Sequence, residues 1–451
     1  MAMVVDRHTL KDLEIFTAQD GGPGLFDRLD RTNTRGGAAA LRRRFHEPRA
    51  SVQEIVRVQR SIRFILERRE LFQRIPVQFV IAGFELYWFG PFGAPVRGGR
   101  IVGFFEMLNL RIDSSSHYQH VLSGVANAMQ ILTSMREILA ATRAELPDAE
   151  IGDLLREVDT ILHEEAIRAV PEGTDVAEWR FWRMLDADRV FRREGRESIG
   201  RLVHLIFEID ALVSMARATE EYGFVLPDVV EGEPFVAVEG LYHPFLTRAV
   251  PNPLRIDPRR RMLFVTGPNM AGKTTYLRAA GTAIHLAHTG MGVPARSMHF
   301  SPCDALYTAI SISDDIHGGI SYFQAEALRA RAVAEAVASG RRVAAIMDEP
   351  FKGTNVKDAL DASVAYFARL ARRPRCMFIV ASHLIEASIA LEEIGHVDCR
   401  CFRASEQGSA LDFDYRLHPG VSDQRLGMRV LQEHGIFGLL DGHSTLEPAT
   451  A

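Results

Sequence analysis

Cysteine is scarce in this sequence of 451 residues, which has four: Cys303, Cys376, Cys399 and Cys401. So few thiols cannot supply a disulfide framework, which excludes the disulfide-stapled class of secreted proteins. The sequence also has no basic leader followed by an apolar segment at its start. We therefore expect a cytoplasmic protein in a reducing compartment.

Long apolar runs are lacking too. The most apolar early stretch, residues 75–92, is interrupted by Gln78, Gly83, Glu85 and Pro91. It falls short of the roughly 18 clean apolar residues that a membrane-spanning helix requires. The pattern predicts a buried segment and no membrane partner.

Lysine is nearly absent, with four residues against 49 arginines, and the net charge is −5. This balance argues against a protein that binds nucleic acid through a surface covered with positive charge. Segment 28–74 is a local exception, because it has thirteen arginines and five acidic residues. Two interpretations remain open for it: a basic face that meets phosphates, or the solvated helix surface that charge runs usually form.

Apolar residues make up 47% of the chain and charged residues 25%, as in ordinary globular proteins. Apolar residues three and four positions apart predict helices from 41 to about 222, including a long connecting helix through 199–213 that ends near Gly223. Beyond Pro227, short apolar runs alternate with helical patterns, which predicts α/β units around a largely parallel sheet.

The predicted organisation therefore has two main parts. We expect an all-α domain over 1–228, an α/β domain over 229–442 and a frayed polar tail over 443–451. The apolar runs that predict strands of the sheet are 262–266, 343–347 and 377–381.

The most informative motif is G-x-x-x-x-G-K-T, which lies between an apolar run and a helical pattern. Its glycines allow a loop whose backbone N–H groups surround phosphate oxygens, and the following helix points its positive end at the same anion. Lys273 would reach the β- and γ-phosphates, and the Thr274 hydroxyl would bind Mg²⁺. The flanking strand and helix disfavour a glycine turn without a ligand. The expected phosphate-binding residues are Gly267, Pro268, Asn269, Met270, Ala271, Gly272, Lys273, Thr274 and Thr275.

Polar side chains follow two further strand patterns. Asp348 would complete the Mg²⁺ shell with Thr274, and Glu349 would orient or deprotonate the attacking water. His383 also follows a strand, so it is expected at the same carboxyl edge, where it could donate a hydrogen bond to a γ-phosphate. The alternatives are an ordinary acidic loop and a structural histidine.

Together these residues resemble the MutS-type ATPases of DNA mismatch repair, a branch of the ABC-type P-loop ATPases. Segment 267–275 is similar to the family's G-P-N-M-x-G-K-S/T-T loop. Segment 313–326 looks like its signature segment, 348–355 resembles its acidic strand with the loop after it, and 381–383 resembles its histidine switch.

Upstream, 25–45 looks like the start of the family's helical core and 209–223 like the end of its lever helix. The resemblance implies a C-terminal ABC-type P-loop ATPase domain preceded by an all-α core and lever domain. It also implies a short member of the family, in which we expect the mismatch-recognition and connector domains to be lacking.

The resemblance further implies a homodimer with two ATP sites at its interface. Gly319 and Ser321 in the signature segment of one subunit would approach the nucleotide of the other, with a helix starting near Tyr322. Tyr242 and Phe245, in a segment similar to the family's entry into the ATPase domain, are candidates for stacking on adenine.

The leading hypothesis is thus an ATPase with ATP and Mg²⁺ as cofactors, which couples ATP-driven dimer states to DNA binding. Its role would be DNA repair or recombination on mismatched or branched DNA. The alternative is an ATP-switched dimeric scaffold or regulatory protein without a DNA substrate. A protein partner is possible under both hypotheses, and the sequence does not identify one.

Overall fold

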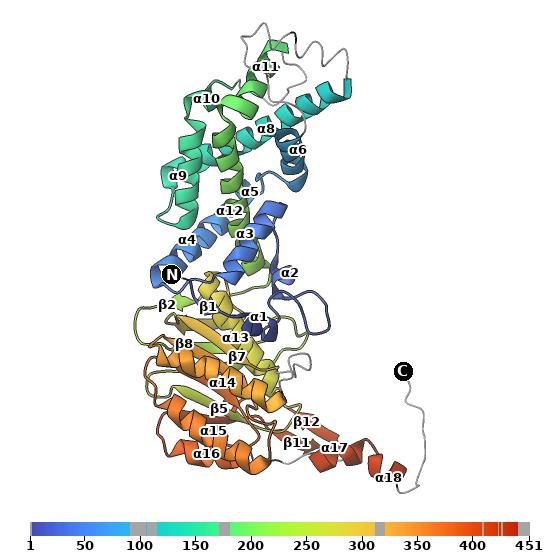
Figure 1. The fold of residues 1–451 in the computed structure, drawn as a ribbon, viewed down its shortest axis with the longest axis vertical. Coiled ribbons are helices and arrows are strands. Elements are labelled where there is room, and N and C mark those ends of the chain that lie inside the picture. Colours follow the sequence, from blue (N-terminus) through green and yellow to red (C-terminus); the bar gives the residue numbers. More distant parts are fainter. Residues whose placement is uncertain are drawn as a thin grey trace.

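The molecule is elongated, with a bundle of helices at one end and an α/β sandwich at the other (Figure 1). The computed structural model describes residues 2–90, 105, 115–170, 181–311, 321–407, 410–422, 424 and 427–440. The predicted tail over 443–451 and the signature residue Gly319 lie outside the described residues.

Helices form the first half, as the apolar spacing predicts. The connecting helix α12 is longer than the predicted segment and ends just before Gly223, whose φ of +61° suits a glycine. It packs against α3, α4 and α9 and so forms the axis of this half. The helices are α1 Arg7–Asp12, α2 Leu25–Leu29, α3 Arg35–His46, α4 Val52–Glu67, α5 Arg69–Phe72, α6 Gln78–Phe89, α8 Ser115–Thr142, α9 Glu150–Leu162, α10 Glu165–Arg168, α11 Phe181–Arg189 and α12 Arg196–Glu221.

The second half is built on a seven-stranded sheet in the order β1-β7-β8-β9-β5-β10-β13. All neighbouring pairs are parallel except β10 and β13, which confirms the predicted largely parallel sheet. The central strands read as unbroken apolar runs because helices cover both faces. The strands of this sheet are β1 Val4–Val5, β5 Met262–Thr266, β7 Ala305–Ala309, β8 Val343–Asp348, β9 Met377–Ala381, β10 Val397–Cys401 and β13 His418–Pro419.

Smaller elements complete this half. A second, four-stranded sheet has the order β2-β6-β3-β4, and β11 pairs with β12 as a hairpin. Its strands and the hairpin are β2 Asp228–Val229, β3 Val236–Leu241, β4 Asn252–Ile256, β6 Ser297–Phe300, β11 Ala404–Gln407 and β12 Ala410–Phe413. The helices are α13 Lys273–Thr289, α14 Tyr322–Ala338, α15 Val356–Ala371, α16 Ile385–Glu392, α17 Gly427–Glu433 and α18 Ile436–Leu440. All four cysteines are buried and free.

The beginning of the chain differs from the predicted organisation. Strand β1 pairs in parallel with β7, so residues that we expected in the all-α domain form the edge of the α/β sheet. The buried Asp12 carboxylate fixes this segment, because it accepts hydrogen bonds from the Thr308 hydroxyl at 2.7 Å and the Ile310 N–H at 2.8 Å. A two-residue strand has no periodicity, and the sequence pattern could not reveal it.

The apolar stretch 75–92 is only partly buried, so the prediction for it is partly wrong. Most of it forms α6, which packs one face against α8 and turns the other outward. Phe84 is 0% exposed on the packed face, whereas Phe79 is 83% exposed on the other. Among the described residues, no helix has the length and apolar character needed to cross a membrane.

Most arginines of segment 28–74 are ion-paired. Nine of the thirteen pair with carboxylates: Arg31, Arg43, Arg44, Arg49, Arg57, Arg60, Arg68, Arg69 and Arg74. Nearly all the partner carboxylates lie beyond the segment, on α8, α9, α12 and the turns between them. The local excess of positive charge is therefore largely compensated in the folded chain, which favours the helix-surface interpretation.

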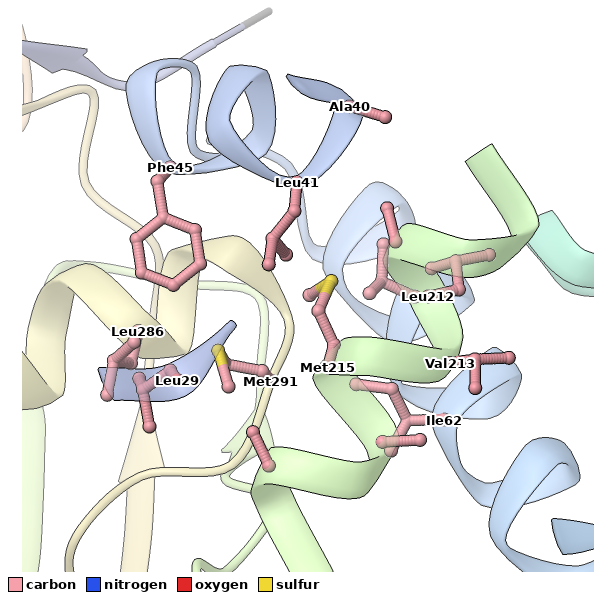
Figure 2. Packing of buried hydrophobic residues seen from close by; sticks show 14 of the residues in the cluster. Leu29, Ala40, Leu41, Phe45, Ile62, Leu212, Val213, Met215, Leu286 and Met291 are labelled. Carbon is pink, nitrogen blue, oxygen red and sulfur yellow. The ribbon is translucent and has the colours of Figure 1, made fainter. Parts of the chain in front are cut away.

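One apolar core joins the two halves. Figure 2 shows Phe45 of α3 turned toward Leu286 of α13, and Leu41 of α3 and Met215 of α12 turned toward each other; each is at most 1% exposed. Because α13 begins at the phosphate-loop motif, the helical half packs directly on the helix that carries this motif. A change in the position of α13 would therefore require the core that it shares with α3 and α12 to repack.

A buried carboxylate on α12 organises the start of α3. Asp210 is 0% exposed and accepts hydrogen bonds from the N–H groups of Asn33 and Thr34, both at 2.9 Å, and from the Thr34 hydroxyl at 2.8 Å. Burial raises the pKa of Asp210, although these donors oppose that effect. The contacts tie the first turn of α3 to the connecting helix.

We predict that Asp210→Ala lowers the free energy of unfolding by about 2–4 kcal/mol, because it leaves buried N–H donors unpaired. Glu220→Ala on the same helix removes an ion pair whose two side chains are at least half exposed, and should cost less than about 1 kcal/mol. Urea unfolding followed by circular dichroism measures both. Equal midpoints for the two variants would contradict this role of Asp210.

Candidate functional site

The motif at 267–275 forms a loop between β5 and α13. Gly267 and Gly272 have φ angles of +139° and +99°, which are accessible to glycine and costly for other residues. A Cβ at Gly267 would lie 2.6 Å from the carbonyl oxygen of Phe402, so this position also lacks room for a side chain. The backbone therefore enters α13 through the tight turn that the motif predicts.

Lys273 bends back over this loop. Its side chain is only 5% exposed, and Nζ donates to the carbonyl oxygens of Gly267 at 2.7 Å and Pro268 at 3.2 Å. Burial lowers the pKa of Lys273, while the acids nearby oppose that shift. The closest of them is Glu349, whose Oε1 lies 4.0 Å from Nζ.

Adjacent parallel strands bring the predicted acids to the loop. Strand β9 lies between β5 and β8, so the carboxyl ends of all three strands meet at one edge. There the Thr274 hydroxyl donates to Asp348 Oδ2 at 2.5 Å. Burial raises the pKa of Asp348, and the hydrogen bond from Thr274 partly offsets this.

Glu349 and His383 lie together at the same edge. Glu349 has a φ of +46°, unusual for a residue with a side chain, and its N–H donates to the Ala381 carbonyl at 2.9 Å. Its Oε1 lies 3.5 Å from Nδ1 of His383. Hydrogen bonding with His383 holds the pKa of Glu349 below its ordinary value, and the same contact raises the pKa of His383.

The pair Thr274 and Asp348 fits a magnesium ion. Mg²⁺ prefers oxygen ligands and is usually held by one or two carboxylates together with substrate phosphates. The two side-chain oxygens already converge to 2.5 Å, and burial disfavours the charge of Asp348, an effect that the nearby Lys273 and Lys352 oppose only in part. A divalent cation at this position would offset that cost.

Ser321 begins α14, as the sequence predicts. Its hydroxyl accepts a hydrogen bond from the N–H of Gln324 at 3.4 Å, and the residue is exposed. On the other side of the signature segment, the Asp12 carboxylate accepts from the N–H of Ser311 at 3.0 Å. Ser311, just before the signature segment, is therefore anchored to α1.

A cavity of about 410 Å³ opens beside the phosphate loop. Tyr242 lines it, together with Met270 and Thr275 of the loop, so this adenine candidate is well situated. Phe245 is not among its lining residues; it lines a separate cavity, where the guanidinium of Arg28 lies 4.6 Å from its ring centroid.

Tyr415, which no sequence motif predicts, also lines the cavity beside the loop. Its ring would lie 3.3 Å from a Cβ placed on Gly272. Tyr415 is far from the loop in the chain and belongs to no motif that we recognised. Tyr415 has a φ of +54° and lies between β12 and β13, so its place beside the loop is visible only in the structure.

The fold and this edge of the sheet define the class of protein: a helical half packed on an α/β half that carries a glycine-rich loop beside two acids. The family model for MutS domain III matches residues 8–216, and that for MutS domain V, the ATPase domain of MutS proteins, matches 263–437. The chain belongs to the MutS family. Proteins with these domains function in DNA repair, which supports a MutS-like role at the level of the family.

We predict that Glu349→Gln lowers the pKa of His383 toward the ordinary value for histidine, because the substitution removes the carboxylate that favours the imidazolium form. As the pH rises, His383 should therefore lose its proton earlier in the variant than in the wild type. An NMR titration of the His383 ring measures the change. Glu335→Gln, in an exposed ion pair on α14, is the control, and an unchanged His383 titration in Glu349→Gln would contradict the pairing.

Proposed function

We propose that this chain is an Mg²⁺-dependent ATPase of the ABC-type P-loop class, whose ATP-driven dimer states control binding of DNA by the helical half. One observation carries the proposal: Lys273, Asp348 and Glu349 meet at one edge of a parallel sheet, directly beside the glycine-rich loop.

Each side chain has a distinct task in this proposal. The loop N–H groups and the Lys273 ammonium bind phosphate oxygens, which replace the carbonyl acceptors of Lys273. Glu349, kept ionised by His383, orients water and accepts its proton. His383, with its raised pKa, donates a hydrogen bond to the γ-phosphate. A bound Mg²⁺, held by Thr274 and Asp348, would neutralise charge on the phosphate oxygens.

The proposed active form is a homodimer. MutS proteins act as dimers on DNA, and Ser321 is exposed at the start of a 17-residue helix, where the helix dipole is positive. An exposed helix start with a hydroxyl suits contact with the γ-phosphate in a second subunit. We infer that hydrolysis requires dimerisation for this reason.

The shared apolar core connects the nucleotide site to the helical half, which would bind DNA. Phe45 of α3 is turned toward Leu286 of α13, and Leu41 of α3 is turned toward Met215 of α12, as Figure 2 shows. A shift of α13 on ATP binding would therefore reposition α12, which runs the length of the helical half. Mismatched or branched DNA is the proposed target, in repair or recombination.

We predict that Lys273→Ala weakens ATP binding by at least about tenfold, because a charge-assisted contact to phosphate is lost. Glu349→Gln should keep ATP affinity and lower turnover by at least about 100-fold, because the amide cannot accept the proton. Calorimetry measures the affinities and phosphate release measures turnover.

The two variants are controls for each other, since they alter neighbouring side chains and should affect different quantities: Lys273→Ala the ATP affinity, and Glu349→Gln the turnover. Equal ATP affinity in wild type and Lys273→Ala would contradict the assignment of the loop. Wild-type turnover in Glu349→Gln would contradict the role of the acid.

A second candidate function is an ATP-switched dimeric scaffold without a DNA substrate. The observation that favours it is the pairing of nine arginines in 28–74, which leaves few of these cations for phosphates. The two functions differ in how they depend on salt, because each neutralised phosphate releases counterions on DNA binding.

For the DNA-binding function, we predict that the logarithm of duplex affinity falls linearly with the logarithm of salt concentration, with a slope of about −0.9 per phosphate contact. Fluorescence anisotropy with matched, mismatched and branched duplexes, with and without ATP, measures this slope. ATP-driven dimerisation with no DNA affinity at low salt would favour the scaffold instead.

A further inference from the structure

A buried glutamate connects α14, the helix that begins in the signature segment, to the loop that follows Asp348 and Glu349. Glu326, in the second turn of α14, is 2% exposed. Its carboxylate accepts hydrogen bonds from the N–H groups of Lys352 at 3.2 Å and Gly353 at 3.1 Å. These two residues follow Glu349 by three and four positions, so Glu326 holds the backbone next to the water-orienting carboxylate.

The loop that Glu326 holds has an unusual backbone. Glu349 has a φ of +46° and Phe351 a φ of +66°, and neither is a glycine. Such conformations persist only where surrounding contacts enforce them. Glu326 supplies two of these contacts, both to the residues directly after Phe351.

The first turn of α14 packs closely on the same loop. A Cβ on Gly353 would lie 2.7 Å from the ring of Tyr322 and 2.9 Å from the backbone nitrogen of Phe323, so only glycine fits. The ammonium of Lys352 lies 5.7 Å from the ring centroid of Tyr322. The first turn of α14 is therefore in contact with the loop after Glu349, and Glu326 lies at the buried end of this contact.

We propose that Glu326 is a positioning residue for hydrolysis, which couples the start of α14 to the position of Glu349. The inference rests on the proposed function, in which Ser321 at the start of α14 contacts the nucleotide of the second subunit. When that contact forms, the first turn of α14 shifts, and Glu326 transfers the shift to the backbone beside Glu349.

The chemistry of the side chain makes this role testable. A carboxylate has two acceptor oxygens and matches two N–H donors, whereas an amide of the same shape has one acceptor and turns an N–H₂ group toward the second donor. Glu326→Gln therefore keeps the packing and breaks one of the two bonds. Glu335→Gln is the matched control, because Glu335 lies on the same helix in an exposed ion pair with Arg331.

The experiment measures ATP affinity and turnover of the full chain. Glu326→Gln should keep ATP affinity within about twofold, because the phosphate loop is untouched, and should lower turnover by about tenfold or more through the displaced carboxylate. Glu335→Gln should match the wild type in both. The effects of two substitutions do not add when the residues are coupled. Ser321→Ala should therefore lower turnover by at least about tenfold in the wild type, but by less than about twofold in the Glu326→Gln background.

Three results would overturn the proposal. The first is wild-type turnover in Glu326→Gln. The second is a loss of both ATP affinity and turnover in Glu326→Gln, which would mark a merely structural role. A Glu326→Gln protein that does not fold would give this same result. The third is full additivity of Ser321→Ala and Glu326→Gln. Failure of the wild type to hydrolyse ATP would instead contradict the proposed function, so the two failures are distinguishable.

Discussion

The hydrogen bond between the Thr274 hydroxyl and the Asp348 carboxylate is the contact on which the site depends. It joins the first turn of α13 to the end of β8 across the width of β9. This bond exists because three parallel strands end at one level, and it fixes the distance between the phosphate loop and the acids. Glu349 Oε1 then lies 4.0 Å from Lys273 Nζ and 3.5 Å from His383 Nδ1. If β8 shifted by one register position against β9, the side chain of Asp348 would turn to the other face of the sheet and lose its contact with Thr274.

Much of this arrangement could be predicted from the sequence because its determinants are local. The bounds of β5 and β9 match the apolar runs 262–266 and 377–381, since strands buried on both faces leave unbroken apolar stretches. Helix α13 begins at Lys273, directly after a glycine turn, and helix α14 begins directly after Ser321, which caps it. Both signals are local in the sequence. The common edge for Asp348 and His383 follows from the rule that parallel strands share their carboxyl end.

Other features depend on contacts between distant segments and left no local pattern. Strand β1 is too short for periodicity and is identified only by its pairing with β7. Tyr415 reaches the cavity beside the loop from a segment after β12, and Phe245 lines a different cavity although it is only three residues from Tyr242. Phe79 is exposed because α6 buries one face, which a uniformly apolar stretch does not reveal. The pairing of Arg44 with Glu150 and Glu208 was likewise not visible in a count of charges.

The central claim is that a triphosphate and its metal ion are bound at this one edge of the sheet. A crystal structure of the full chain with a non-hydrolysable ATP analogue and Mn²⁺ tests it most directly, because the anomalous signal of Mn²⁺ locates the metal independently of the protein. We expect an anomalous peak between the Thr274 hydroxyl and Asp348, with phosphate density enclosed by the loop and Lys273. Nucleotide bound elsewhere, or Mn²⁺ at a position distant from Asp348, would contradict it.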